Sequence, residues 1–229
     1  MPQTDTGLFD YAVSYGMPSL LMTAVFVCVL PVVYFKFVRR RFARWPARLA
    51  VLCCVWLAFF IAAYGDVLWI AWNARRLCES EAGLRVYRAV EAEGFLGESD
   101  IDTWGAHGFR FLESRNLLDE LVRHEIIDGK STVTPVNSLR SAYEYSYSIT
   151  PVAYRLSRQQ HEIRPIGSRT VLGSLTTFTL FPGWLDRYVT AGAGWTPVVC
   201  EGPGVKKVNE LKLRAPELIE RTLKPKMDR

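Results

Sequence analysis

The side chains that most often carry chemistry are few in this chain, and their spacing fits no familiar catalytic motif. His124 and His161 are each followed by a glutamate, but no second histidine stands three residues after either glutamate, as a zinc-protease helix requires. No Gly-x-Ser-x-Gly motif occurs, and residues 202–207 lack the spacing and the Ser or Thr of a phosphate loop. We therefore expect no catalytic, metal or cofactor site, no enzyme, and both histidines on the surface.

Two of the five cysteines are placed to form a cross-link. Cys28, Cys53 and Cys54 lie in apolar stretches, where a thiol behaves as a small apolar group. Cys78 and Cys200 lie in the more polar remainder and can pair in an oxidising compartment. Closing such a long loop is worth about 5 kcal/mol in the chain-entropy model. We predict a disulfide between Cys78 and Cys200; the alternative is two unrelated buried thiols.

Two apolar stretches predict membrane-spanning helices. Residues 17–35 contain no charged residue, and residues 49–73 contain only Asp66. Each stretch can cross a hydrocarbon core of about 30 Å at 1.5 Å per residue. Asp66 falls about one and a half turns inside the outer end of the second span, where a carboxylate is costly unless it reaches water or a partner. It therefore either extends toward the outer headgroups or pairs with a partner helix.

The charges around the two spans predict their orientation. Residues 36–48 hold six basic residues and no acid, whereas residues 1–16 hold two acids and no base. Basic residues in short loops stay cytoplasmic, so the loop is expected inside and both termini outside, although Arg75 and Arg76 oppose this rule. The loop residues expected to lie against anionic headgroups are Lys36, Arg39, Arg40, Arg41, Arg44 and Arg48. The pI near 9.0 is thus a topology signal, and we expect no nucleic-acid partner.

Residues 74–204 predict an α+β domain outside the membrane, and residues 205–229 predict a basic, solvated tail with a short helix. Residues 79–93 indicate a helix by their apolar spacing, and Asp-Gly at 128–129 predicts a hairpin turn. Residues 115–125 fit either a helix or a strand. The strand patterns lie at residues 108–113, 121–127, 130–135, 141–149, 154–166 and 168–181. We expect the helix to pack on one face of an antiparallel sheet of about five or six strands.

A cluster of aromatic and glycine residues late in the chain is a candidate interaction surface. Tryptophan, tyrosine and arginine dominate the energetic hot spots of protein interfaces. The residues assigned to this surface, beside Asp66, are Trp184, Arg187, Tyr188 and Trp195. The alternative is that Trp184 closes the core of the domain under a turn.

Two short motifs carry a resemblance to a group of bacterial proteins. The first is Cys-Glu-Ser-Glu-Ala-Gly at 78–83 with Tyr87 and Val90, and the second is Gly-Trp-Leu-Asp-Arg at 183–187 ahead of Cys200. Together they resemble small two-pass inner-membrane proteins of proteobacteria that carry no assigned function. The resemblance implies a proteobacterial origin and a periplasmic domain, and it supplies no catalytic residue.

The sequence therefore predicts a membrane protein that binds other proteins. A chain with 22% charged and 13% aromatic residues is not disordered, and its apolar stretches indicate a membrane protein. The resemblance implies that this membrane is the bacterial inner membrane. We expect a periplasmic interaction domain of an accessory or assembly subunit in an envelope complex, whose partner is another envelope protein or a second copy. The alternative is a periplasmic enzyme or small-ligand sensor, which a pocket with converging polar groups and shifted pKa values would favour.

Overall fold

The computed structural model divides the chain into two compact units, and each is described by itself. Unit 1 comprises Met1–Glu81, Pro151–Ser157 and Phe178–Glu210, and unit 2 comprises Ala82–Thr150, Arg158–Thr177 and Leu211–Arg229. The residues that the structure describes are 24, 27–29, 31–32, 34, 36, 45–181, 183–184, 198–200, 205–207 and 215–226. Most of the predicted first span and of the basic loop lies outside them, as do Arg187, Tyr188 and Trp195.

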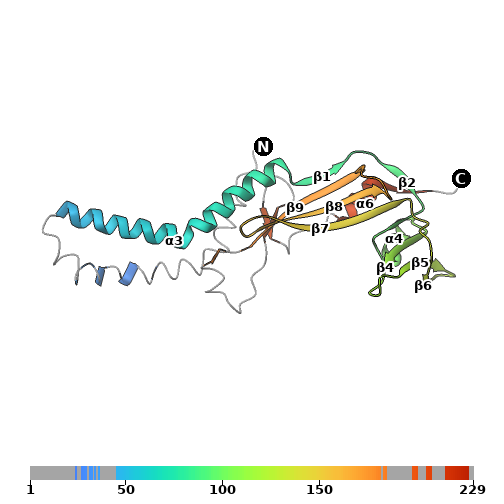
Figure 1. Ribbon diagram of the computed structural model, residues 1–229, viewed down its shortest axis with the longest axis horizontal. Coiled ribbons are helices and arrows are strands. Elements are labelled where there is room, and N and C mark those ends of the chain that lie inside the picture. The colour runs from blue at the N-terminus through green and yellow to red at the C-terminus, as the bar shows by residue number, and fades with distance from the viewer. Residues whose placement is uncertain are drawn as a thin grey trace. The chain divides into compact units, whose positions relative to one another are not determined.

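The long helix α3, Trp45–Ser80, is the main helix of unit 1 (Figure 1). Its first part, Trp45–Ala62, is long and apolar enough to cross a membrane and contains no buried residue. Among the described residues it is the one segment that meets this test, so the structure shows one candidate membrane helix where the sequence predicted two. Figure 1 also shows that α3 bends about midway along its length.

The second part of α3 differs from the first because one of its faces is buried. The buried residues are Val67, Ile70, Ala71, Ala74 and Cys78. They recur every three or four positions, which places them on a single side of the helix. Leu68, Trp69 and Trp72 stay exposed on the remaining surface. The helix therefore changes from a segment without buried residues to one packed against the rest of its unit.

Short strands complete the described part of unit 1. β10, Val198–Cys200, and β11, Val205–Lys207, form an antiparallel pair. β10 also pairs antiparallel with the end of β9, Gly173–Leu180, where Val198 lies opposite Leu180 and Cys200 opposite Phe178. All three residues of β10 are buried, as expected for a short apolar strand with a neighbour on each side.

The predicted helix at 79–93 is wrong, because α3 ends at Ser80 and strands follow. β1, Gly83–Val86, pairs antiparallel with β9, and β2, Val90–Ala92, pairs parallel with β12, Leu223–Pro225. Gly83, the first residue of β1, has φ of 125°, a conformation that glycine adopts easily and that a helix does not contain. The apolar spacing is real, but hydrogen bonds to distant strands replace those of a local helix.

Ten of the described strands form one mixed sheet, which is larger than predicted. Its order is β11-β10-β9-β8-β7-β3-β4-β5-β6, with β1 paired to β9 as a branch. The strands not yet bounded are β3 Gly94–Leu96, β4 Phe111–Arg115, β5 Leu121–Ile127, β6 Lys130–Pro135, β7 Tyr143–Ala153 and β8 Leu156–Pro165. β3 lies between β4 and β7 and is parallel to both, so the sheet is not purely antiparallel. The α+β class itself is confirmed.

The hairpin of β5 and β6 is confirmed. Asp128 and Gly129 have φ of 52° and 74°, which is the positive pair that a two-residue hairpin turn requires. The ambiguous segment 115–125 is resolved as the end of β4, a turn, and the start of β5.

The core of unit 2 packs two short helices against the strands. In α4, Ile101–Ala106, Trp104 meets Phe95 and Phe109 edge to face, with ring centroids 5.6 and 6.0 Å apart. α6, Ala215–Thr222, buries Leu218 and Ile219 in the same cluster. The segment expected as a solvated tail is therefore part of the core, because one face of α6 is apolar.

Candidate functional site

α3 and Trp184 are joined in unit 1 by two hydrogen bonds, one to Asp66 and one to Ala62. The Asp66 Oδ2 atom accepts the backbone N–H of Trp184 at 2.6 Å. The indole Nε1–H of Trp184 donates to the carbonyl of Ala62 at 2.8 Å. Ala62 lies one helical turn before Asp66, so both acceptors are on the same side of α3. We call Ala62, Asp66 and Trp184 the α3 clamp.

Gly183, the residue before Trp184, allows this segment to lie close to α3. A Cβ atom at Gly183 would lie 2.6 Å from Cγ2 of Val67 and 2.9 Å from Oδ2 of Asp66. Real Cβ atoms do not approach other atoms so closely, so only glycine fits here unless the neighbouring side chains or the backbone shift. The Gly-Trp pair noted in the sequence is therefore a close contact with α3.

The clamp gives Asp66 a partner within its own chain. Besides the Trp184 N–H, the Asp66 carboxylate accepts the N–H of Val67 at 2.8 Å. Asp66 lies beyond Trp45–Ala62, the part of α3 that is suited to cross a membrane. Trp184 remains 40% exposed, so it covers the helix without being sealed in a core. The sequence placed both residues on the candidate interaction surface but did not connect them. Contact of Asp66 with a second protein stays a prediction.

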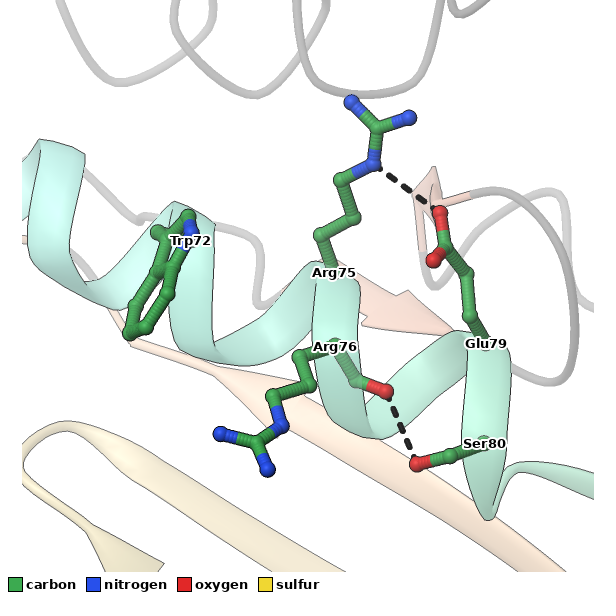
Figure 2. A pocket seen from close by; sticks show the side chains of 5 residues that line it. All are labelled: Trp72, Arg75, Arg76, Glu79 and Ser80. Atoms are coloured by element: carbon green, nitrogen blue, oxygen red, sulfur yellow. Dashed lines mark hydrogen bonds and ion pairs between the residues drawn. The ribbon is translucent and has the colours of Figure 1, made fainter.

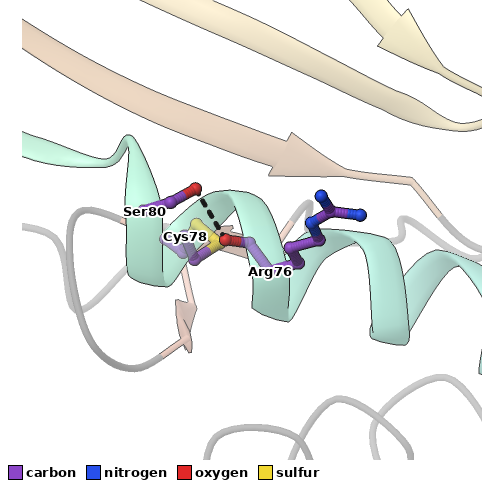
Figure 3. The surroundings of a disulfide bond; sticks show 4 residues. Arg76, Cys78 and Ser80 are labelled. Atoms are coloured by element: carbon purple, nitrogen blue, oxygen red, sulfur yellow. Dashed lines mark hydrogen bonds between the residues drawn. A yellow bond between two sulfur atoms is a disulfide. The ribbon is translucent and has the colours of Figure 1, made fainter.

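The predicted disulfide between Cys78 and Cys200 is present. It joins the last turn of α3 to β10, with Cα atoms 6.0 Å apart (Figure 3). Both cysteines are buried, whereas Cys28, Cys53 and Cys54 are free and exposed. Asp66 and Cys78 are about 18 Å apart along the helix at 1.5 Å per residue. The second part of α3 is thus attached at two separated points, one of them covalent.

A hollow of about 450 Å³ lies on the final turns of α3 (Figure 2). Its lining residues are Trp72, Arg75, Arg76, Glu79 and Ser80. The Arg75 Nε–H donates to Glu79 at 2.9 Å, and the Ser80 hydroxyl donates to the carbonyl of Arg76 at 2.8 Å. Figure 2 shows the Arg75 and Arg76 side chains leaving the helix in opposite directions. The hollow is thus lined by an aromatic ring, a hydroxyl and two arginines whose guanidinium groups point apart.

A second group of titratable side chains lies on β7 and β8 in unit 2. The Tyr145 hydroxyl is 2.6 Å from Nδ1 of His161, and the Tyr147 ring lies 4.6 Å from the imidazole, centroid to centroid. Burial raises the pKa of Tyr145 to about 12, with the charges of Glu98 and Tyr147 adding to the effect. Burial lowers the pKa of His161, and burial together with Asp100 raises the pKa of Glu98. Such shifts gather at functional sites more often than elsewhere.

The expectation that both histidines lie on the surface is wrong, because each is partly buried and hydrogen-bonded. His124 Nε2 is 2.9 Å from the Ser114 hydroxyl, the spacing of a nucleophile and its base. In the described parts of the chain, however, no carboxylate orients the His124 ring. The same parts bring no three potential metal ligands together. The Ser114–His124 and Tyr145–His161 pairs arise from the register of neighbouring strands, which the spacing of residues in the sequence does not show.

Glu113 is a buried carboxylate that sequence analysis treated as an ordinary strand residue. It is 0% exposed and accepts the backbone N–H of Ser141 at 2.8 Å, that of Arg140 at 3.0 Å, and Nη2 of Arg123 at 2.7 Å. Burial alone would raise the pKa of Glu113, but these hydrogen bonds outweigh it and hold the pKa below its usual range. The Arg140 guanidinium also lies 4.6 Å from the centre of the Phe111 ring. These contacts organise the fold and leave no open site.

We compared the chain with family models, with curated proteins and with solved structures, and none of them matches it. Its function is therefore inferred from its own structure. The most informative contacts are those that attach α3 to the rest of unit 1, the α3 clamp and the Cys78–Cys200 disulfide.

Proposed function

We propose that the chain is a two-span bacterial inner-membrane protein that presents a periplasmic interaction domain, as an accessory or assembly subunit of an envelope complex. The observation that carries this proposal is that α3 changes along its length from an apolar segment without buried residues to a segment with one buried face. Its exposed apolar part suits lipid, and its second part is attached to unit 1 by the α3 clamp and by a disulfide. A helix of this kind holds a folded domain directly against the membrane from which it emerges.

The disulfide supports the periplasmic placement of the domain, because such bonds persist in oxidising compartments. The basic residues at 36–48 support a cytoplasmic loop, with both termini outside. The resemblance to two-pass proteobacterial proteins agrees with this arrangement.

The turn between β4 and β5 is the surface that best supports protein binding. Leu117 and Leu118 are 105% and 78% exposed at its tip. The turn is nevertheless ordered, because Oδ1 of Asn116 accepts the N–H groups of Leu118 and Glu120, each at 2.9 Å. Burying a leucine is worth about 1.5–3 kcal/mol, so a rigid turn that presents two of them favours a protein partner.

The membrane arrangement is tested with a reporter that is active only outside the cytoplasm. Fused after Arg229 it should be active, and inserted within residues 39–44 it should be silent. The reverse pattern would refute the proposed topology and remove the oxidising environment that the disulfide needs.

The interaction role is tested by affinity purification of the full chain in mild detergent. Replacing Leu117 and Leu118 together by asparagine should remove the proteins that co-purify with the wild type. Ile149→Asn, at another exposed apolar site on β7, is the control and should retain them. Recovery of the same proteins with all three chains would contradict binding through this turn.

The Tyr145–His161 pair favours the second candidate function, a periplasmic enzyme or small-ligand sensor. A partly buried phenol and imidazole with displaced pKa values can exchange a proton with a bound molecule. A thermal-shift screen of small anions and sugars should then find a ligand whose effect disappears in Tyr145→Phe. A screen in which no compound discriminates the variant from the wild type would set this candidate aside.

A further inference from the structure

Arg75 and Arg76 lie where the proposed topology disfavours basic residues. They follow the second predicted span on its outer side, although lysine and arginine near membrane ends are normally kept in the cytoplasm. Arg75 is explained by its ion pair with Glu79 one turn later, at 2.9 Å. Arg76 has no such carboxylate among the described residues, and its side chain is exposed. Its position calls for a different anionic partner.

The surroundings of Arg76 indicate the chemistry of that partner. Trp72 lies four residues earlier and Ser80 four residues later, so the three line one side of the helix along the hollow. A guanidinium group offers five N–H donors in a flat fork that matches the oxygens of a phosphate. An exposed tryptophan is typical of the zone where lipid headgroups meet the acyl chains. A phosphate joined to an apolar body fits this combination.

The length of α3 is sufficient to bring Arg76 to the level of the lipid phosphates. Trp45 and Trp72 are 67% and 64% exposed and lie about 40 Å apart along the helix. A bilayer with its headgroup regions is about 40–45 Å thick, so an upright α3 with the Trp45 ring at one interface would carry the Trp72 ring to the other. Arg76 follows Trp72 by one turn.

We propose that the hollow beside Trp72 and Arg76 binds the phosphate of an anionic phospholipid from the periplasmic leaflet. This inference rests on the proposed membrane function and extends it, because it assigns a lipid ligand to the side of the membrane opposite the basic loop. The bound lipid neutralises Arg76 and holds the second part of α3 at the headgroup level, close to the disulfide at Cys78.

The experiment uses the full chain, purified in detergent and titrated with phosphatidylglycerol while bound lipid is counted by native mass spectrometry. The wild type should bind phosphatidylglycerol more tightly than phosphatidylcholine. Arg76→Gln should weaken phosphatidylglycerol binding about fivefold, as expected for one basic residue at an anionic surface. Arg76→Lys keeps the positive charge but loses the flat fork of N–H donors. Its affinity for phosphatidylglycerol should therefore lie between that of the wild type and that of Arg76→Gln. Arg115→Gln, an exposed arginine paired with Asp119 in unit 2, is the matched control and should bind as the wild type.

Several outcomes would overturn the inference. Equal binding by the wild type and Arg76→Gln would do so, provided that the Cys78–Cys200 bridge in the variant shows it to be folded. Displacement of the lipid by millimolar inorganic phosphate would assign the hollow to free phosphate instead. Failure of these titrations with a correct reporter pattern would refute only the lipid site, whereas a reversed reporter pattern would refute the membrane proposal itself.

Discussion

The carboxylate of Asp66 accepts the backbone N–H of Trp184 at 2.6 Å, across 118 residues of sequence. An acid in a long apolar helix is ordinarily explained by water or by a partner helix. Here the acceptor is satisfied by the segment that follows β9, and the indole of the same tryptophan returns to the helix at Ala62. The relationship shows that this part of α3 belongs to the folded unit as much as to the apolar segment before it.

Removing the Asp66 carboxylate should loosen the clamp. Asp66→Leu leaves the Trp184 N–H without its acceptor, and hydrogen bonds to charged groups contribute about 1.5–3 kcal/mol, so the free energy of unfolding should fall by about that amount. Asp66→Asn keeps an acceptor and should lose less. Asn73→Leu, whose side chain donates only to the carbonyl of Trp69 within α3, is the control and should have a smaller effect. Thermal unfolding of the full chain in micelles measures all three, and unchanged stability in Asp66→Leu would contradict the clamp.

A methyl group at residue 183 should separate the two sides of the clamp. Gly183→Ala puts a Cβ atom 2.6 Å from the Val67 side chain and 2.9 Å from the Asp66 carboxylate, so these side chains or the backbone at Trp184 must move. Overpacking of this kind typically costs about 1–3 kcal/mol. Gly65→Ala, where the nearest atom is at 3.6 Å, is the control and should be neutral or stabilising, because alanine favours helix. Limited proteolysis should cut Gly183→Ala faster than the wild type near Trp184; equal rates would argue against a tight contact.

The disulfide should be closed in freshly isolated membranes. Cys78 and Cys200 should resist alkylation until a reductant is added, whereas free thiols at both sites would show that the bridge does not form in the cell. Cys78→Ser and Cys200→Ser should destabilise the protein alike, by up to about 5 kcal/mol, because each removes the same cross-link. Cys53→Ser is the control, since that thiol is free, and it should leave the alkylation pattern of the other two unchanged.

Glu113 should make the stability of the protein fall in acid. Its pKa in the fold lies below the unfolded value of about 4.3, so its contribution is complete above that pH and is lost as the pH falls through the folded pKa. Glu113→Gln should lower the free energy of unfolding at pH 7 by about 3 kcal/mol, because Arg123 loses its buried partner. Urea unfolding at pH 7, 5 and 3 should show this difference shrinking toward pH 3. The exposed Glu91→Gln is the control; a difference for Glu113→Gln that stays constant with pH would contradict the assignment.

The sequence by itself determined the features that depend on composition or on neighbouring residues. The apolar run after residue 45 specifies a helix suited to lipid, and Asp128-Gly129 specifies a hairpin turn, because a few adjacent side chains decide both. The pairing of Cys78 with Cys200 was also accessible, since the other three cysteines lie in apolar stretches.

Only the tertiary structure decided which distant segments meet. Residues 83–92 have a helical spacing of apolar side chains, yet they form β1 and β2 because β9 and β12 supply the hydrogen bonds. The insertion of β3 between β4 and β7 has the same origin. Asp66 and Trp184 were each recognisable as unusual residues, but their bond depends on the path of more than one hundred intervening residues. Local patterns record what a segment tends to form, whereas a contact between remote groups exists only once the whole chain has closed around them.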